Sequence, residues 1–229
     1  MLITARSVSR EFIRQGKGTN RFVAVKPTDI SLESGRLCVL MGRSGSGKST
    51  LLNLLSGLLT PTSGNILYDE RDIYSLSDEE LSKFRNANIG VIPQGQTAIQ
   101  SLSVTDNICL SYMLYGKSGE LRAARKEAEK LMERLGIAEL KDVMPSELSG
   151  GELRRMAIAR ALLRKPAAVF ADEPTCDLDD ENTAFVLELL RETAHAGAAV
   201  FVVTHEKDAE GYADELFDMN AGELKKRGI

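Results

Sequence analysis

Two kinds of hydrophobic pattern divide the chain into three parts. In the first part, residues 3–12 and 22–32 carry β-branched residues at alternating positions, which predicts two strands joined by a Gln-Gly-Lys-Gly turn at residues 15–18. From about residue 104 to residue 163 the strand signals vanish and helical periodicity takes over. The last part alternates short apolar runs with helical patterns, which predicts a parallel sheet covered on both faces.

The same patterns predict the individual elements. Strands are expected at residues 37–41, 65–68, 89–92, 168–171, 199–203 and, more weakly, 215–219, and helices at residues 50–57, 120–135, 151–163 and 180–196. Ser77, followed by three acidic residues, is a further helix-start signal. The helical middle is expected as an insertion into an α/β core, with the core at about 1–94 and 164–229 and the helical subdomain at about 95–163.

Composition narrows the class of protein. The chain has 229 residues, 43% of them hydrophobic, and a net charge of -4, which suits one domain with a subdomain. No basic block dominates, so nucleic acid is not an expected partner, and Lys225, Lys226 and Arg227 are expected to form a solvated tail. No apolar run approaches the ~18 residues of a transmembrane helix, and the first residues lack the order of a signal peptide.

Cysteine usage indicates a reducing compartment. Cys38, Cys109 and Cys176 are odd in number, widely scattered and without metal-ligand spacing. They are expected to be free thiols of a cytosolic protein, for which any role at a membrane requires a partner.

The strongest chemical signal is a glycine-rich loop. Residues 42–49 read Gly-Arg-Ser-Gly-Ser-Gly-Lys-Ser, after an apolar strand and before a helix. A loop in that context aims backbone N–H groups and the positive end of a helix dipole at one point, which suits a polyphosphate. Lys48 can reach the β- and γ-phosphates, and the Ser49 hydroxyl can ligate Mg²⁺. Alone, the loop allows a kinase, a GTPase or a motor.

A pair of carboxylates supplies the second half of such a site. The apolar run 168–171 ends in Asp172 and Glu173. Ligands in open α/β sheets bind beyond the carboxyl ends of strands, so Asp172 is expected beside the loop, where it can hold the Mg²⁺ shell. Glu173 would then point toward the γ-phosphate and orient a water. Without the loop, acidic residues exposed at a strand end would explain this pair equally well.

A second anion-binding helix start lies in the helical middle. Residues 148–152 read Leu-Ser-Gly-Gly-Glu and open a predicted helix, so a hydroxyl and two glycines stand at its N-terminus. By itself this segment is better explained as an ordinary capped helix. Together with the loop at 42–49 it implies either two ligands or one ligand shared between two copies of the chain.

These motifs resemble those of a known family. The chain resembles the nucleotide-binding subunits of ABC transporters in the order and spacing of its motifs, over essentially its whole length. The motifs that carry the resemblance are residues 42–49, residues 148–152, Asp172-Glu173 and Thr204-His205. The segment at 148–152 matches the signature that separates this family from other phosphate-loop ATPases. The resemblance implies an α/β fold: a phosphate-loop NTPase core with a mostly parallel sheet, an N-terminal antiparallel β subdomain and an inserted α-helical subdomain.

The resemblance also implies roles for single residues. Phe12 matches the aromatic that stacks on adenine, Gln94 the glutamine that contacts Mg²⁺ and the attacking water, and His205 the histidine that contacts the γ-phosphate. The full nucleotide-binding set comprises Phe12, Gly42, Ser44, Gly45, Ser46, Gly47, Lys48, Ser49, Thr50, Ser149, Gly150, Gly151 and Asp179. The catalytic set is Glu173, His205 and Gln94, and the metal ligands are Ser49, Gln94 and Asp172. His195 lacks such a context and is expected on the surface.

The implied assembly is a head-to-tail dimer with Mg²⁺ and ATP. ATP on residues 42–49 of one copy would be covered by Ser149 and Gly151 of the other, at the cytoplasmic face of the membrane through a permease. Residues 72–85, leading to Ile89-Gly90, are similar to the branch of lipoprotein-releasing, macrolide-export and bacitracin-resistance ATPases, whose permeases have few transmembrane helices and a large extracytoplasmic domain. A mechanical or signalling complex, as in the related cell-division ATPase, shares every catalytic residue and stays open.

The chain departs from the pattern of that branch in three segments. Phenylalanine is usual next to the glutamine, whereas this chain has Pro93 before Gln94 and Gly95 after it, and proline removes a donor and fixes φ. Cys176-Asp177 replaces a small residue and asparagine, and Glu152 replaces glutamine at the end of the signature. None of these changes removes a catalytic group, so they affect the expected partner and not ATP hydrolysis.

Overall fold

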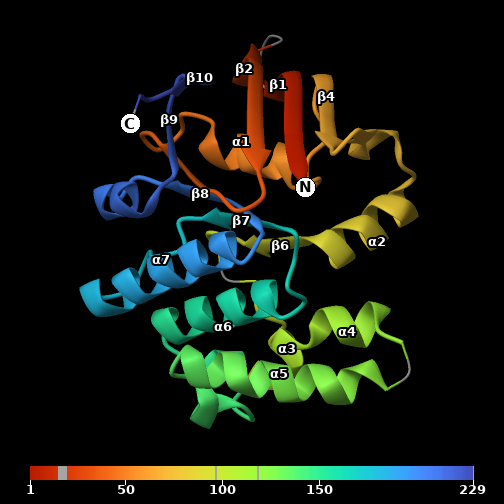
Figure 1. Ribbon diagram of the computed structural model, residues 1–229, viewed down its shortest axis with the longest axis vertical. Helices are drawn as coiled ribbons and strands as arrows, with labels where there is room; N and C mark the ends of the chain where they lie inside the picture. The colour runs from red at the N-terminus through yellow and green to blue at the C-terminus, as the bar shows by residue number, and fades with distance from the viewer. Residues whose placement is uncertain (15–19, 96, 118, 229) are drawn as a thin grey trace.

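Two β-sheets and a group of helices build the molecule (Figure 1). The computed structural model describes residues 1–14, 20–95, 97–117 and 119–228, so the turn expected at residues 15–18 lies outside the described residues. The first sheet is antiparallel, with strand order β2-β1-β4-β5. Its strands are β1 (Leu2–Arg14), β2 (Asn20–Glu33), β4 (Ser63–Tyr68) and β5 (Arg71–Asp72).

The second sheet carries the parallel strands that the apolar runs predict. Its order is β10-β9-β3-β8-β7-β6, and every neighbouring pair is parallel except β9 with β10. Its strands are β3 (Leu37–Met41), β6 (Ile89–Ile92), β7 (Ala168–Asp172), β8 (Ala199–Thr204), β9 (Glu215–Asn220) and β10 (Glu223–Lys226). The expected strands at 37–41, 89–92, 168–171, 199–203 and 215–219 are confirmed to within one residue.

Successive side chains along the strands of this sheet point to opposite faces and pack into two separate hydrophobic cores. On β3, Leu37 and Val39 pack into one core with the helices, while Cys38 and Leu40 pack into the other with the antiparallel sheet. The helix α1 (Lys48–Leu55) belongs to the second core and contacts β1, β2, β7 and β8. Because both faces are buried, the strands are continuous apolar runs and not alternating ones.

Helices fill the chain between β6 and β7, and in Figure 1 they form the layer below the parallel sheet. They are α3 (Val104–Ile108), α4 (Leu110–Tyr115), α5 (Glu120–Arg134) and α6 (Gly150–Leu162), with short 3-10 turns at Ala138–Leu140 and Pro145–Glu147. Elsewhere in the chain lie α2 (Asp78–Asn88), α7 (Asp180–His195) and 3-10 turns at Ile73–Ser75 and Lys207–Tyr212. Ser77 caps α2 by accepting from the Glu80 N–H, as its sequence predicts. Among the described residues, none of the helices combines the length and apolarity needed to cross a membrane.

The C-terminal segment corrects the sequence analysis. Lys225 and Lys226 are exposed as expected, but they do not form a free tail, because a turn at Ala221 and Gly222 returns the chain as β10, antiparallel to β9. Arg227 then pairs with Asp218 at 2.7 Å and with Glu210 at 3.0 Å. Both turn residues have positive φ, which is uncommon for Ala221 but ordinary for Gly222. The glycine two residues after Asn220 was therefore a turn signal in the sequence.

Phe170 tests how far the fold depends on the sheet interior. Its ring is fully buried on β7 and meets that of Phe201 edge-on, with centroids 6.3 Å apart. Phe170→Ala should lower the free energy of unfolding by about 3–5 kcal/mol, because it leaves a cavity that the sheet cannot close. Phe185→Ala on α7, where the side chain is 37% exposed, should cost less than about 1 kcal/mol. Urea unfolding measures both, and equal losses would contradict this assignment of the core.

Candidate functional site

Four neighbouring parallel strands end at one edge of the sheet, and each leads into one of the predicted motifs. The glycine-rich loop follows β3, His205 follows β8, Asp172 ends β7, and Gln94 follows β6. In the register, Met41 stands beside Thr204, and Asp172 beside Val203. The strand order β3-β8-β7-β6 therefore brings together groups that lie far apart in the sequence.

The loop at residues 42–49 approaches neighbouring backbone more closely than a side chain would allow. Gly47 has φ 109°, and a Cβ there would lie 2.2 Å from the Ala24 carbonyl oxygen. The Gly222 N–H donates to the Ser46 carbonyl at 2.9 Å, so the β9–β10 turn supports the loop. The Ser46 hydroxyl is buried and finds no hydrogen-bond partner among the described residues, as expected where a ligand oxygen completes the set.

Lys48 and Ser49 occupy the first turn of α1. The Lys48 side chain is 7% exposed, and its Nζ donates to the Gly42 carbonyl at 2.8 Å, so the amine is held over the loop. Burial chiefly raises the pKa of Asp172, and an interaction with the neighbouring Ser49 side chain opposes this rise. The Ser49 hydroxyl and the Asp172 carboxylate are neighbouring hard oxygen donors, and such donors suit a divalent cation such as Mg²⁺.

Most of these groups share one cavity of about 820 Å³. Its lining consists of Phe22, Ala24, Arg43, Ser44, Gly45, Gly47, Lys48, Ser49, Thr50, Gln94, Glu173 and His205. The cavity is large enough for a nucleotide, and it is lined by the loop, a lysine, a carboxylate and an aromatic ring.

Glu173 is held in a strained and buried position. It has φ 50°, is 6% exposed, and accepts from the Thr204 hydroxyl at 2.9 Å. Its other carboxylate oxygen lies 2.9 Å from the His205 Nδ1. The hydrogen bond to Glu173, and then the charge of Glu173, raise the pKa of His205. The pair that the sequence assigns to catalysis is therefore in direct contact.

The residues of the signature motif lie in a different cavity, of about 460 Å³. Its lining comprises Ser149, Gly150, Gly151, Arg155, Asp177, Leu178, Asp179 and Asn182. Ser149 caps α6 by accepting from the Glu152 N–H, and Asp179 caps α7 by accepting from the Asn182 N–H. Because no residue lines both cavities, one chain presents two separate half-sites.

The aromatic residue expected to stack on adenine does not line the large cavity. Phe12 and Phe22 stand directly opposite each other in the β1–β2 register, but Phe22 lines the large cavity and Phe12 does not. The adenine contact at Phe12 stays a prediction, and Phe22 is an additional aromatic candidate. Sequence reasoning missed Phe22 because its closeness to the loop depends on strand pairing.

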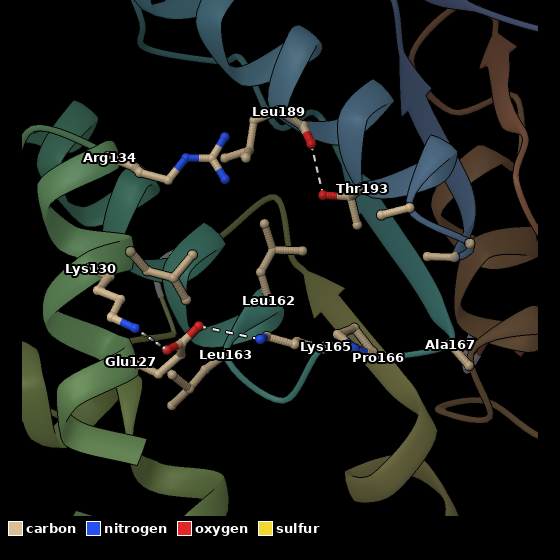
Figure 2. A pocket seen from close by; sticks show the side chains of 14 residues that line it. Glu127, Lys130, Arg134, Leu162, Leu163, Lys165, Pro166, Ala167, Leu189 and Thr193 are labelled. Carbon is tan, nitrogen blue, oxygen red and sulfur yellow. Dashed lines mark hydrogen bonds and ion pairs between the residues drawn. The ribbon is translucent and has the colours of Figure 1, made fainter. Parts of the chain in front are cut away.

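A further cavity, of about 630 Å³, lies at the amino ends of β7 and β8, the opposite edge of the sheet from the loop. Figure 2 shows Lys130 and Lys165 both paired with Glu127 at its rim, at 3.1 and 3.3 Å. No predicted site residue lines it. The described residues also contain no group of three His, Cys, Asp or Glu side chains that could hold a metal, and all three cysteines are free thiols.

Comparison with known proteins identifies the family. The profile of the ABC transporter family matches residues 25–176. The chain belongs to this family. It is 36% identical to the lipoprotein-releasing system ATP-binding protein LolD 2 of Chlorobium chlorochromatii, over 97% of this chain and 93% of that protein. It is 37% identical to the macrolide export ATP-binding/permease protein MacB of Neisseria meningitidis, over 97% of this chain but only 34% of that protein.

A solved structure agrees with the fold of this ABC ATPase. A dimeric ATP-binding cassette in a post-hydrolysis state, bound to ADP and Pi, superimposes with a TM-score of 0.88 at 30% identity, over 99% of this chain and all of that one. The predicted fold class and the prediction of an ABC-type nucleotide-binding ATPase subunit are confirmed. The roles of the single site residues stay predictions.

The contact between Glu173 and His205 predicts a titration. In NMR spectra, the pKa of His205 should lie above the ordinary value of about 6.5, because the imidazolium donates to a carboxylate. Since the folded-state pKa is raised, protonation of His205 favours folding at low pH, and this contribution is lost as the pH rises through the folded-state pKa. Glu173→Gln should lower the His205 pKa; an unchanged value would contradict the contact. The His195 signal, from the end of α7, is the internal control.

Proposed function

We propose that two copies of this ABC ATPase bind ATP head to tail and drive a membrane permease from its cytoplasmic face. The observation that carries the proposal is the separation of the phosphate loop and the signature motif into two cavities of one chain. A second copy, rotated by a two-fold axis, would bring each signature onto the partner's loop and make two equal sites. The dimeric cassette with ADP and Pi supports this arrangement by its similarity to the chain.

The roles follow from the contacts. Lys48 and the backbone of the loop would hold the phosphates, and Ser49, Asp172 and Gln94 would hold Mg²⁺, which supplies charge neutralisation at the phosphate oxygens. Ser149, Gly150 and Gly151 of the partner would cover the γ-phosphate with helix N–H groups. Asp179 keeps the start of α7 in place beside them.

Hydrolysis would depend on positioning more than on covalent chemistry. Glu173 is fixed by Thr204 and His205, so its carboxylate is available to orient and polarise one water. His205 must exchange Glu173 for the γ-phosphate as its partner when ATP arrives. Closure of the dimer excludes other water, and the charge of the separated products then favours reopening.

Glu173→Gln gives the direct test. Without the carboxylate, hydrolysis should slow by about 100- to 10,000-fold, while the amide still occupies the site. The variant should then elute as a dimer in size-exclusion chromatography with saturating Mg-ATP and as a monomer without nucleotide.

Lys48→Ala in the same background is the matched control. It removes the amine that faces the phosphates and should elute as a monomer with or without ATP. A Glu173→Gln variant that stays monomeric at saturating ATP would refute the head-to-tail dimer.

A groove on the side of the molecule suits the permease. It has a volume of about 440 Å³ and is lined by Leu58, Ser82, Arg85, Asn86, Ile89, Gly90, Val91, Leu110, Ser111, Tyr115, Arg160, Ala161 and Arg164. Leu58 and Tyr115 are 51% and 47% exposed, and no acidic residue lines it. An apolar segment with acidic side chains, from a cytoplasmic loop of the permease, would fit this surface. Three residues of β6 line the groove, and the strand is followed by Pro93 and then Gln94.

If the groove binds the permease, substitutions in it should abolish permease binding without abolishing ATP hydrolysis. The double variant Leu58→Asp and Tyr115→Asp should keep the basal ATPase rate within about twofold, yet lose the co-purifying permease, because buried carboxylates would face the incoming apolar segment. Leu2→Asp, at an exposed leucine on β1, is the control and should retain the permease. Retention of the permease by the double variant would exclude the groove as the docking surface.

The transported substrate is proposed from the relatives. Proteins named for lipoprotein release and macrolide export favour export or extraction of a peptide, lipoprotein or drug, through a permease with few transmembrane helices and a large extracytoplasmic domain. The alternative is a mechanical or signalling complex. ATPase assays of the purified complex decide between them: stimulation by candidate peptides supports transport, and stimulation only by an extracytoplasmic hydrolase supports the alternative.

A further inference from the structure

Arg154 is a buried cation that holds the segment around Gln94. The residue lies in α6 and is 8% exposed. Its Nη1 donates to the Pro93 carbonyl at 2.6 Å, and its Nη2 donates to the Gln94 carbonyl at 2.7 Å. In the part of the chain that the structure describes, no ion pair to a carboxylate is formed by this guanidinium. Two main-chain oxygens of one short segment thus satisfy a charge that is costly to bury.

The geometry of this link is strict. A planar guanidinium presents parallel N–H groups in a fixed fork, and here the fork spans two successive carbonyls. Pro93 adds stiffness because its ring fixes φ and removes a donor. Gln94 therefore has little freedom to move unless α6 moves with it.

The same helix begins at the other half-site. Ser149, Gly150 and Gly151 lie at the start of α6, about one turn before Arg154. Gly150, Gln94 and Arg154 line one small cavity of about 50 Å³, so the start of the helix and the Gln94 segment are neighbours. Gln94 also lines the cavity of the phosphate loop, whereas Gly150 does not. The helix thus touches one half-site with its first turn and the other through Arg154.

We propose that Arg154 is a positioning residue that makes Gln94 of one copy respond to the ATP bound against the start of α6 by its partner. The inference rests on the head-to-tail dimer proposed above. When the partner's ATP engages Ser149 and the two glycines, α6 is drawn toward the interface. Because Arg154 is hydrogen-bonded to the Gln94 segment, Gln94 moves with α6. Its side chain is then placed to orient the attacking water in the nucleotide site of its own copy. The two sites therefore hydrolyse ATP cooperatively.

The test compares Arg154→Gln with Arg154→Lys in the full chain. For the unchanged protein, the ATPase rate should depend on ATP concentration with a Hill coefficient of about 2. Arg154→Gln should lower the Hill coefficient to about 1 and kcat by about 10- to 100-fold, as displaced catalytic groups do. Nucleotide affinity of the monomer, measured with a fluorescent ADP analogue, should change by less than about twofold. Arg154→Lys keeps the charge without the fork and should fall between the two.

Arg134→Gln is the matched control. Arg134 also joins two helices, with its Nη2 2.6 Å from Glu192, but on α5 and α7 and away from both half-sites. This variant should keep the Hill coefficient and kcat of the unchanged protein.

Two results would overturn the role of Arg154. One is an Arg154→Gln protein that keeps a Hill coefficient of about 2. The other is a monomer affinity that falls in proportion to kcat, which would indicate general damage to the site. Failure of the dimer itself gives a different outcome, since Glu173→Gln would then stay monomeric with ATP even where Arg154 is intact.

Discussion

The parallel hydrogen bonding of β3, β8, β7 and β6 is the constraint on which the rest of the structure depends. Parallel strands place all of their carboxyl ends at one edge, and here four motifs follow those ends. The register sets Met41 beside Thr204 and Ile92 beside Ala171. A slip of one residue would exchange the two faces of a strand and carry buried apolar side chains to the wrong core. The packing of the two cores therefore also fixes the spacing of the chemical groups.

That edge concentrates polar groups that would be unfavourable elsewhere. Asp172 and Glu173 are both buried, and Glu173 adopts a left-handed conformation that a residue with a side chain rarely takes. Neighbouring hydroxyl groups and His205 compensate by hydrogen bonding to them. The Lys48 amine bonds to carbonyls of its own loop, so a phosphate would replace interactions that already orient the amine. The site is arranged in advance for charge that the ligand brings.

The residues at which this chain departs from its family include Pro93, after β6, and Cys176 and Asp177, before α7. Pro93, one of these departures, accepts a hydrogen bond from Arg154 of α6 through its carbonyl, and residues of both β6 and α6 line the groove of the proposed permease contact. Cys176 and Asp177 stand in the turn between Glu173 and the cap of α7, with Asp177 at φ 67°. None of them donates to the phosphate loop among the hydrogen bonds of the described residues. They lie instead beside α6 and α7, between these helices and the residues predicted to be catalytic.

Local sequence determined the strands, most helix starts and the types of chemistry. Apolar runs, the capping pattern at Ser77 and the loop at residues 42–49 depend on neighbours within a few positions, and each was recognisable without the fold. Contacts between segments that are distant in the sequence were not recognisable in this way. The placement of Phe22 at the cavity depends on strand pairing, and the hydrogen bonds from Arg154 to the carbonyls of residues 93 and 94 span about 60 residues, so no local pattern encodes them. The type of each residue determines the chemistry of its side chain, whereas the packing of the whole chain determines which side chains lie close together.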